Sequence, residues 1–160
     1  MNWIRHFAQE LTKGHEADPW HGPSTKSLLE GLTAVQVASH SIRELHSIWE
    51  IVLHMDAWQR EVLRRLDAGF VPEIPEEGDW RTVLEVSGKA WQAAVSDLDS
   101  SLHELVRVLN TMAKTADENT VWESSAGTLS GLLQHNAYHS GQIALLRKTL
   151  QQKNQELEQT

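Results

Sequence analysis

Apolar residues recur at three- and four-residue steps along most of this chain, and no clear strand-like alternation of apolar and polar residues is evident. The first pattern is typical of amphipathic helices. Glycine and proline, which interrupt helices, fall in a few places and divide the pattern into segments. The sequence therefore predicts an all-α protein, a four-helix bundle whose helices are joined by short connections.

The segment boundaries follow from the apolar stripes and from capping residues. Ser47 and Glu50 fit a capping box, and Asp79 is a plausible N-cap. Pro19 and Pro23 separate a short helical piece from the first segment, and the pattern leaves open whether the two form one kinked helix or two. The predicted helical segments are Trp3 to about Gly14 with the piece from Ser24, Ser47 to Leu66, Asp79 to about Met112, and Thr128 to about Leu150. Loops are predicted at 69–78 and 115–127, and a fraying polar tail from about residue 151.

The length of 160 residues suits one domain covering 1–160. The apolar runs are far shorter than the roughly 20 residues of a membrane span. The N-terminal residues lack the apolar region of a secretory signal. We therefore expect a cytoplasmic protein without a membrane partner.

The net charge of −8 argues against nucleic acid as a partner, because the 14 lysines and arginines are scattered and form no extended basic face. The nearest cluster, at Arg60, Arg64 and Arg65, alternates with acidic residues and is interpreted as a solvated helix face.

The chain contains no cysteine. Disulfides, thiolate metal sites and a cysteine nucleophile are therefore excluded. Any bound metal must use nitrogen or oxygen ligands, and any thiol in the chemistry must come from outside the protein.

His135 and His139 are four residues apart, so they project from the same face of a helix and can reach one metal ion. The residue after the first histidine is Asn136, so the glutamate base of an H-E-x-x-H zinc protease is missing. With nine histidines in the chain, a chance pair or a pair of hydrogen-bonded core histidines is an alternative explanation.

His54 is the best candidate for a third ligand, because it lies at the margin of the apolar stripe of the second segment. His46 and Glu50 lie on the same side at four-residue steps. Glu50 fits the capping box better than a role near a metal, and His46 is expected just outside the helix. A di-iron carboxylate site is excluded, since no histidine here follows a glutamate by three residues.

The stretches Trp20-His21-Gly22-Pro23-Ser24, His46-Ser47-Ile48-Trp49-Glu50 with His54 and Trp58, and the run from His135 to Lys148 with its H-x3-H-x-G-Q-I pattern resemble the DinB-like superfamily. This superfamily includes damage-inducible DinB proteins and bacillithiol- and mycothiol-dependent transferases. The resemblance spans roughly residues 20–150. It implies a four-helix bundle, often a homodimer, with a divalent metal on His54, His135 and His139.

Three neutral imidazoles would leave a coordination position open, as in catalytic metal sites. Nitrogen ligands suit Zn²⁺ or Ni²⁺ and do not exclude Fe²⁺ or Mn²⁺. The leading hypothesis is a metal-dependent thiol transferase that activates an external low-molecular-weight thiol towards a small-molecule substrate. The alternatives are a hydrolase that uses metal-bound hydroxide and a non-catalytic bundle that senses or stores metal.

No catalytic base is identified from the sequence. The candidates for residues near the pocket are His21, His46, Glu50, Trp58, Tyr138 and Gln142. Trp20 and Trp58 are expected at the pocket mouth and Trp49 and Trp91 in the core. Helix-end or interface positions are predicted for Trp3, Trp80 and Trp122, and surface positions for His6, His15, His40 and His103.

Overall fold

The computed structural model of the chain describes residues 2–68, 74–76, 78–115 and 117–158. Within these residues it contains six helices and no strand. The helices are α1 (Trp3–Glu16), α2 (Thr25–Leu29), α3 (Ala34–Ala38), α4 (Ile48–Ala68), α5 (Gly88–Thr115) and α6 (Glu118–Glu158). The predicted all-α helical bundle is confirmed.

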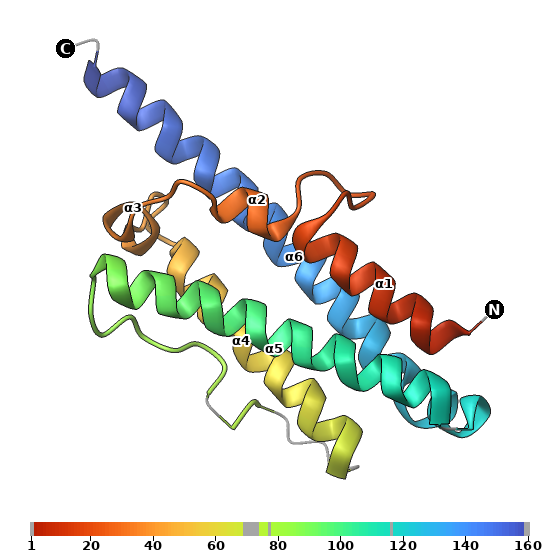
Figure 1. The fold of residues 1–160 in the computed structure, drawn as a ribbon. Coiled ribbons are helices and arrows are strands. Elements are labelled where there is room, and N and C mark those ends of the chain that lie inside the picture. Colours follow the sequence, from red (N-terminus) through yellow and green to blue (C-terminus); the bar gives the residue numbers. More distant parts are fainter. Residues whose placement is uncertain (1, 69–73, 77, 116, 159–160) are drawn as a thin grey trace.

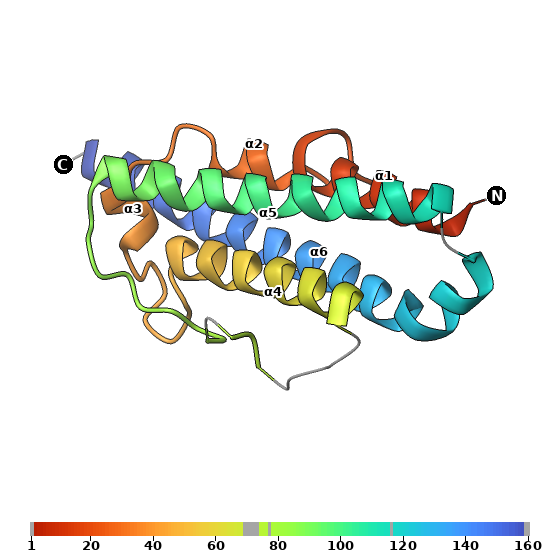
Figure 2. The ribbon, with the colours of Figure 1, turned by 60° about the horizontal axis from the view of Figure 1, so that its bottom comes forward.

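Four long helices, α1, α4, α5 and α6, make up the bundle (Figure 1). Both α1 and α4 pack against α5 and against α6. The short helix α2 packs on α6 and α1, while α3 packs on α4 and α5 near the start of α5 (Figure 2). The first helical stretch is thus two separate helices, and α3 is an element that the sequence analysis did not assign. None of the described helices has the length and apolar content that a membrane span requires.

The apolar core consists of two clusters, one toward each end of the bundle. One contains Ile48 and Met55 of α4 with Ile143 of α6, and the other contains Val62 of α4 with Leu129 of α6. Trp49 and Trp91 are buried in the first cluster and meet edge to face, as core residues do. Along α4, α5 and α6, polar groups are buried at the level between the two clusters: Gln59, Ser101, His139 and Ser140. The histidine pair predicted from the sequence lies in this polar layer.

The start of α5 differs from the prediction, because the helix begins at Gly88 and not at Asp79. The Ser87 hydroxyl accepts a hydrogen bond from the Ala90 amide at 3.1 Å and caps the helix. Residues 79–87, here called the crossing segment, have no regular structure and run past α4 to reach α5 (Figure 2). Arg81 fastens this segment by donating to the Leu53 carbonyl at 2.9 Å and to Asp56 at 3.1 Å. Tertiary contacts with α4 therefore outweigh the helical pattern here.

Helix α6 is longer than predicted at both ends. It begins at Glu118, so most of the predicted 115–127 connection is helical, and it continues to Glu158 through the tail that was expected to fray. Glutamine, lysine and glutamate, which dominate the tail, are good helix formers. The last turns extend beyond the bundle (Figure 1). Residues 69–73 and 77 of the predicted loop and the side chain of Trp122 lie outside the described part of the structure.

Candidate functional site

The structure brings three imidazoles together between α4 and α6. His54 comes from α4, and His135 and His139 come from successive turns of α6. One nitrogen from each ring lies within 4.8 Å of the other two, an arrangement that could hold a metal ion. The Nε2 atoms of His54 and His135 are 2.8 Å apart. We call these three residues the histidine triad.

Two rings of the triad are oriented by oxygen acceptors at Nδ1, the nitrogen that faces away from the other rings. His54 Nδ1 lies 2.8 Å from the backbone oxygen of Asp79, and His139 Nδ1 lies 2.7 Å from Oε1 of Gln142. A carbonyl oxygen only accepts, so each Nδ1 carries the proton and each Nε2 keeps its lone pair. Such partners fix the tautomer and the ring orientation of metal-binding histidines.

In the metal-free protein, His135 donates a hydrogen bond to the Nε2 lone pair of His54. Because Nε2 of His54 keeps its lone pair, the 2.8 Å contact requires a proton on Nε2 of His135. The Nδ1 atom of His135 lies 3.4 Å from Oδ1 of Asn136. If the proton of His135 moved to Nδ1, Nδ1 could donate a hydrogen bond to Asn136, and the lone pair on Nε2 would be free to bind a metal ion.

Burial keeps the triad neutral. Removal from water, together with the two neighbouring imidazoles, lowers the pKa of His135 to about 4. Burial likewise lowers the pKa of His139 to about 4, and the pKa of His54 also falls below its usual value. At neutral pH the site therefore presents lone pairs and not positive charges, as a cation requires.

The crossing segment closes one side of the triad. Trp80 stacks on His54 with ring centroids 3.9 Å apart and planes within 2°, and His46 stacks on Trp80 at 3.6 Å. The Asp79 carboxylate accepts a hydrogen bond from Trp58 Nε1 at 2.9 Å and lies 3.2 Å from His54 Nδ1. Sequence reasoning placed Asp79 at a helix start and Trp80 at a helix end, so it missed both residues at the site. A tryptophan directly after a loop rich in glycine and proline was the available signal.

Glu50 and His46 do not join the triad. The Glu50 carboxylate accepts from the Ser47 amide at 2.8 Å, and the Glu50 amide donates to the Ser47 hydroxyl at 3.2 Å. The capping-box interpretation is therefore correct. His46 precedes α4, is exposed, and reaches the site only through its stack on Trp80.

Gln142 and Tyr138 lie beside the triad, as expected. While Gln142 accepts from His139, its amide nitrogen donates to the Tyr138 hydroxyl at 3.0 Å. Tyr138 is largely exposed, so this series of hydrogen bonds leads from the buried imidazole of His139 to the surface. Trp58 also lies at the site, with its ring 5.9 Å from that of His135.

His21 and Trp20 line a cavity other than the one beside the triad, contrary to the expectation that His21 lies near the pocket and Trp20 at its mouth. They line a separate cavity of about 180 Å³, between α1, the loop before α2 and α6. The Thr25 and Ser140 hydroxyls, 2.8 Å apart, contribute to the same wall. The Trp20 side chain is fully exposed. The loop packs against the α1 side of α6, which the sequence pattern did not indicate.

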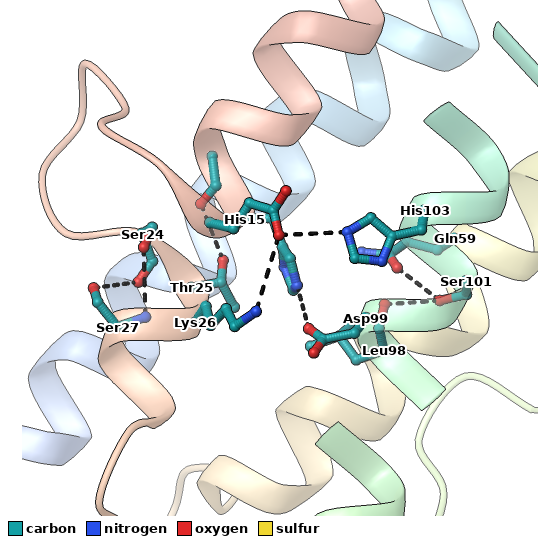
Figure 3. Close-up of polar contacts among 12 residues, drawn as sticks. His15, Ser24, Thr25, Lys26, Ser27, Gln59, Leu98, Asp99, Ser101 and His103 are labelled. Atoms are coloured by element: carbon teal, nitrogen blue, oxygen red, sulfur yellow. Dashed lines mark hydrogen bonds and ion pairs between the residues drawn. The ribbon is translucent and has the colours of Figure 1, made fainter. Parts of the chain in front are cut away.

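His15 was predicted at the surface but is buried. Its Nε2 pairs with an Asp99 oxygen at 2.5 Å, which accounts for a histidine in the interior (Figure 3). Nearby, Glu16 lies 3.4 Å from His103 and 4.0 Å from Lys26. These pairs connect α1 to α2 and to α5 and are structural. The surface positions predicted for His6, His40 and His103 agree with their exposure.

The donor set of the triad fits a divalent cation of borderline character. Three neutral nitrogens that converge from two helices leave coordination positions open, unlike a closed structural site. In the described part of the chain, the nearby carboxylates are engaged elsewhere. Asp79 lies behind His54, and Glu50 caps α4. A cavity of about 360 Å³ beside His135 offers an approach from solvent.

Comparison with known proteins gives one match. A family model described as the DinB superfamily matches residues 20–143, more than half of the chain and all three triad residues. No curated protein and no solved structure matches the chain.

Proposed function

The chain belongs to the DinB superfamily, and from this premise we propose that it is a metal-dependent thiol S-transferase that acts on a small electrophile. The proposed metal ligands are His54, His135 and His139, and the proposed metal is Zn²⁺ or Ni²⁺. A divalent cation at the triad would act as a Lewis acid that lowers the pKa of an incoming thiol.

The absence of cysteine from the whole chain supports an external thiol. The reaction needs a soft nucleophile, and the protein has none of its own. A low-molecular-weight thiol co-substrate would supply it. In the proposed step the thiol sulfur attacks an electrophilic carbon and the carbon–sulfur bond forms. The leaving group departs with the electron pair of its bond, and the thiol proton passes to solvent.

The protein's own residues orient the ring nitrogens of the triad and exclude water from it. Asp79 and Gln142 hold the Nε2 lone pairs of His54 and His139 in fixed directions. Nε2 of His135 carries the proton that must move to Nδ1 before all three Nε2 lone pairs can bind a metal ion. Trp80 covers one face of His54 and keeps water from it.

In the part of the chain that the structure describes, no carboxylate near the triad is free to act as a base, and this observation favours thiol transfer over hydrolysis. Hydrolysis of an ester or amide commonly uses a general base or acid beside the metal. Within the described residues the carboxylates closest to the triad are occupied, Asp79 by Trp58 and Glu50 by the start of α4. A thiol whose pKa is lowered at the site needs no base.

The test uses untagged protein loaded with Zn²⁺ or Ni²⁺. Chloroacetamide with 2-mercaptoethanol measures thiol transfer, and p-nitrophenyl acetate without thiol measures hydrolysis. We expect thiol alkylation above the uncatalysed rate, and its loss in His135→Ala. Ester hydrolysis alone would replace the proposal with a hydrolase. Tight metal binding without either reaction would point to metal sensing or storage.

A further inference from the structure

A cavity of about 360 Å³ lies between α4 and α6, directly beside the triad. Trp58 and Val62 line it from α4, and Leu132 and His135 line it from α6. Its volume is within the range of small-molecule sites, which begins at about 300 Å³. His135 belongs both to this cavity and to the triad, so an occupant of the cavity has one end at the proposed reaction site.

Part of the cavity wall is helix backbone. Gly127 and Gly131 of α6 both line the cavity, and among the described residues no atom beyond their own stretch of helix lies within 4 Å of the position that a Cβ would take at either residue. A flat group can therefore approach the backbone closely. The opposite wall carries the indole of Trp58, whose ring favours contact with another aromatic ring.

The positive charge at the rim of the cavity is already compensated. Arg65 lines the cavity, and its Nε donates to a Glu61 oxygen at 2.9 Å. Glu61 is fully buried and also accepts from Arg64 at 3.2 Å, and Arg64 in turn lies 3.8 Å from Glu76, so two carboxylates face the two arginines. The guanidinium also lies 5.4 Å from the Trp58 ring centroid. The cavity therefore offers little attraction to a carboxylate or phosphate and favours an uncharged occupant.

We propose that this cavity binds a flat, uncharged apolar arm of the electrophile, such as an aromatic ring, and thereby sets the substrate class. The inference rests on the proposed function for the identity of the reacting group. It does not rest on that function for the binding of the arm, which can be measured alone.

Gly131→Leu is the variant that fills the cavity. Leucine at this helical position meets no atom near its Cβ and has a higher helix propensity than glycine, so the bundle should fold. Gly141→Leu is the matched control. Gly141 lies on the same helix, is exposed, has the same free space and does not line the cavity.

Binding is measured first, by titration calorimetry of the metal-loaded protein with N-benzylacetamide, which has the aromatic arm but no leaving group. We expect binding to wild type and to Gly141→Leu, weakened about tenfold or more in Gly131→Leu, since a ring loses its buried contact area. Equal affinity in all three proteins, or no binding to wild type, would overturn the inference.

Kinetics then separate the two proposals. With 2-mercaptoethanol as thiol, we expect wild-type kcat/KM to favour N-benzylchloroacetamide over chloroacetamide by about tenfold or more. This preference should survive in Gly141→Leu and fall toward unity in Gly131→Leu. Binding of N-benzylacetamide without turnover of either electrophile would refute the transferase and keep the cavity assignment. Turnover of both electrophiles at equal kcat/KM, without binding of N-benzylacetamide, would keep the transferase and refute the cavity assignment.

Discussion

The Nδ1 atom of His54 lies 2.8 Å from the backbone oxygen of Asp79, which is 25 residues further along the chain. This contact joins α4 to the crossing segment and determines which nitrogen of His54 faces the other two imidazoles. The acceptor is a backbone atom, so this hydrogen bond is available to any residue at position 79, and the Asp79 carboxylate adds a second contact with the same nitrogen at 3.2 Å. The triad is thus prepared by the path of the chain as well as by its histidines.

Replacing any member of the triad should abolish stoichiometric metal binding. His54→Ala, His135→Ala and His139→Ala each remove one of three nitrogens that lie within 4.8 Å of one another. Elemental analysis of untagged protein should find one divalent metal per wild-type chain and little in the variants. His103→Ala, at an exposed position on α5, is the control and should retain the metal. Full metal content in the three variants would place the metal elsewhere.

Gln142→Leu should weaken metal affinity by about 10- to 100-fold without unfolding the bundle. The substitution removes the acceptor that lies 2.7 Å from His139 Nδ1, so the ring and its tautomer are no longer fixed. Competition with a chelator of known affinity measures the change. Gln134→Leu, at an exposed position on the same helix, should leave the affinity unchanged. An equal loss in both variants would show that the effect is not specific to His139.

The metal-free protein should lose stability as the pH falls from about 6.5 to about 4. Burial lowers the pKa of His135 and of His139 to about 4 in the folded state, whereas histidine in the unfolded chain titrates near 6.5. Between these values the unfolded state binds more protons, so the free energy of unfolding rises with pH through this window. Urea unfolding at a series of pH values measures the slope.

The matched comparison for this pH dependence is the double variant His135→Asn with His139→Asn. It removes both titrating groups but keeps polar side chains at the two positions. Its free energy of unfolding should vary less with pH between 4 and 6.5 than that of wild type. Parallel slopes for the two proteins would assign the pH dependence to other groups.

Glu50→Ala should lower the free energy of unfolding by about 1 kcal/mol and leave metal binding intact. The Glu50 carboxylate accepts from the Ser47 amide at the start of α4 and does not reach the triad. Glutamine also serves at this position of a capping box, so Glu50→Gln should recover most of the lost stability. Thermal unfolding and elemental analysis together test the prediction. Metal loss in Glu50→Ala would contradict it.

The bundle and the histidine pair of α6 could be predicted because both follow from local regularities, whereas the resemblance to the DinB-like superfamily fixed His54 as the third member of the triad. The three-to-four spacing along α4 and α6 indicates which faces are buried, and His135 and His139 obey the same spacing. His54 sits at the margin of such a face. The structure brings all three rings to the polar layer between the two core clusters.

The residues that complete the site could not be predicted in this way. Asp79 and Trp80 belong to a segment whose apolar residues follow a helical spacing, but its tertiary contacts, among them the hydrogen bond from Arg81 to Leu53, hold it without regular structure. His15 was misplaced because its partner, Asp99, is 84 residues away in the sequence. Periodicity describes one helix at a time and carries no information about such distant pairs.

Because of the crossing segment, one side of the triad can open on a different timescale from the unfolding of the bundle. Residues 79–87 are held by a few contacts through Asp79, Trp80 and Arg81 and by the packing of Val83 on the first core cluster, whereas the helices form the two clusters themselves. Local opening of this segment breaks only those few contacts, so it requires far less free energy than unfolding of the core. Changes in this short stretch of chain can therefore alter how often the Trp80 side of the triad opens, while the lifetime of the folded protein stays the same.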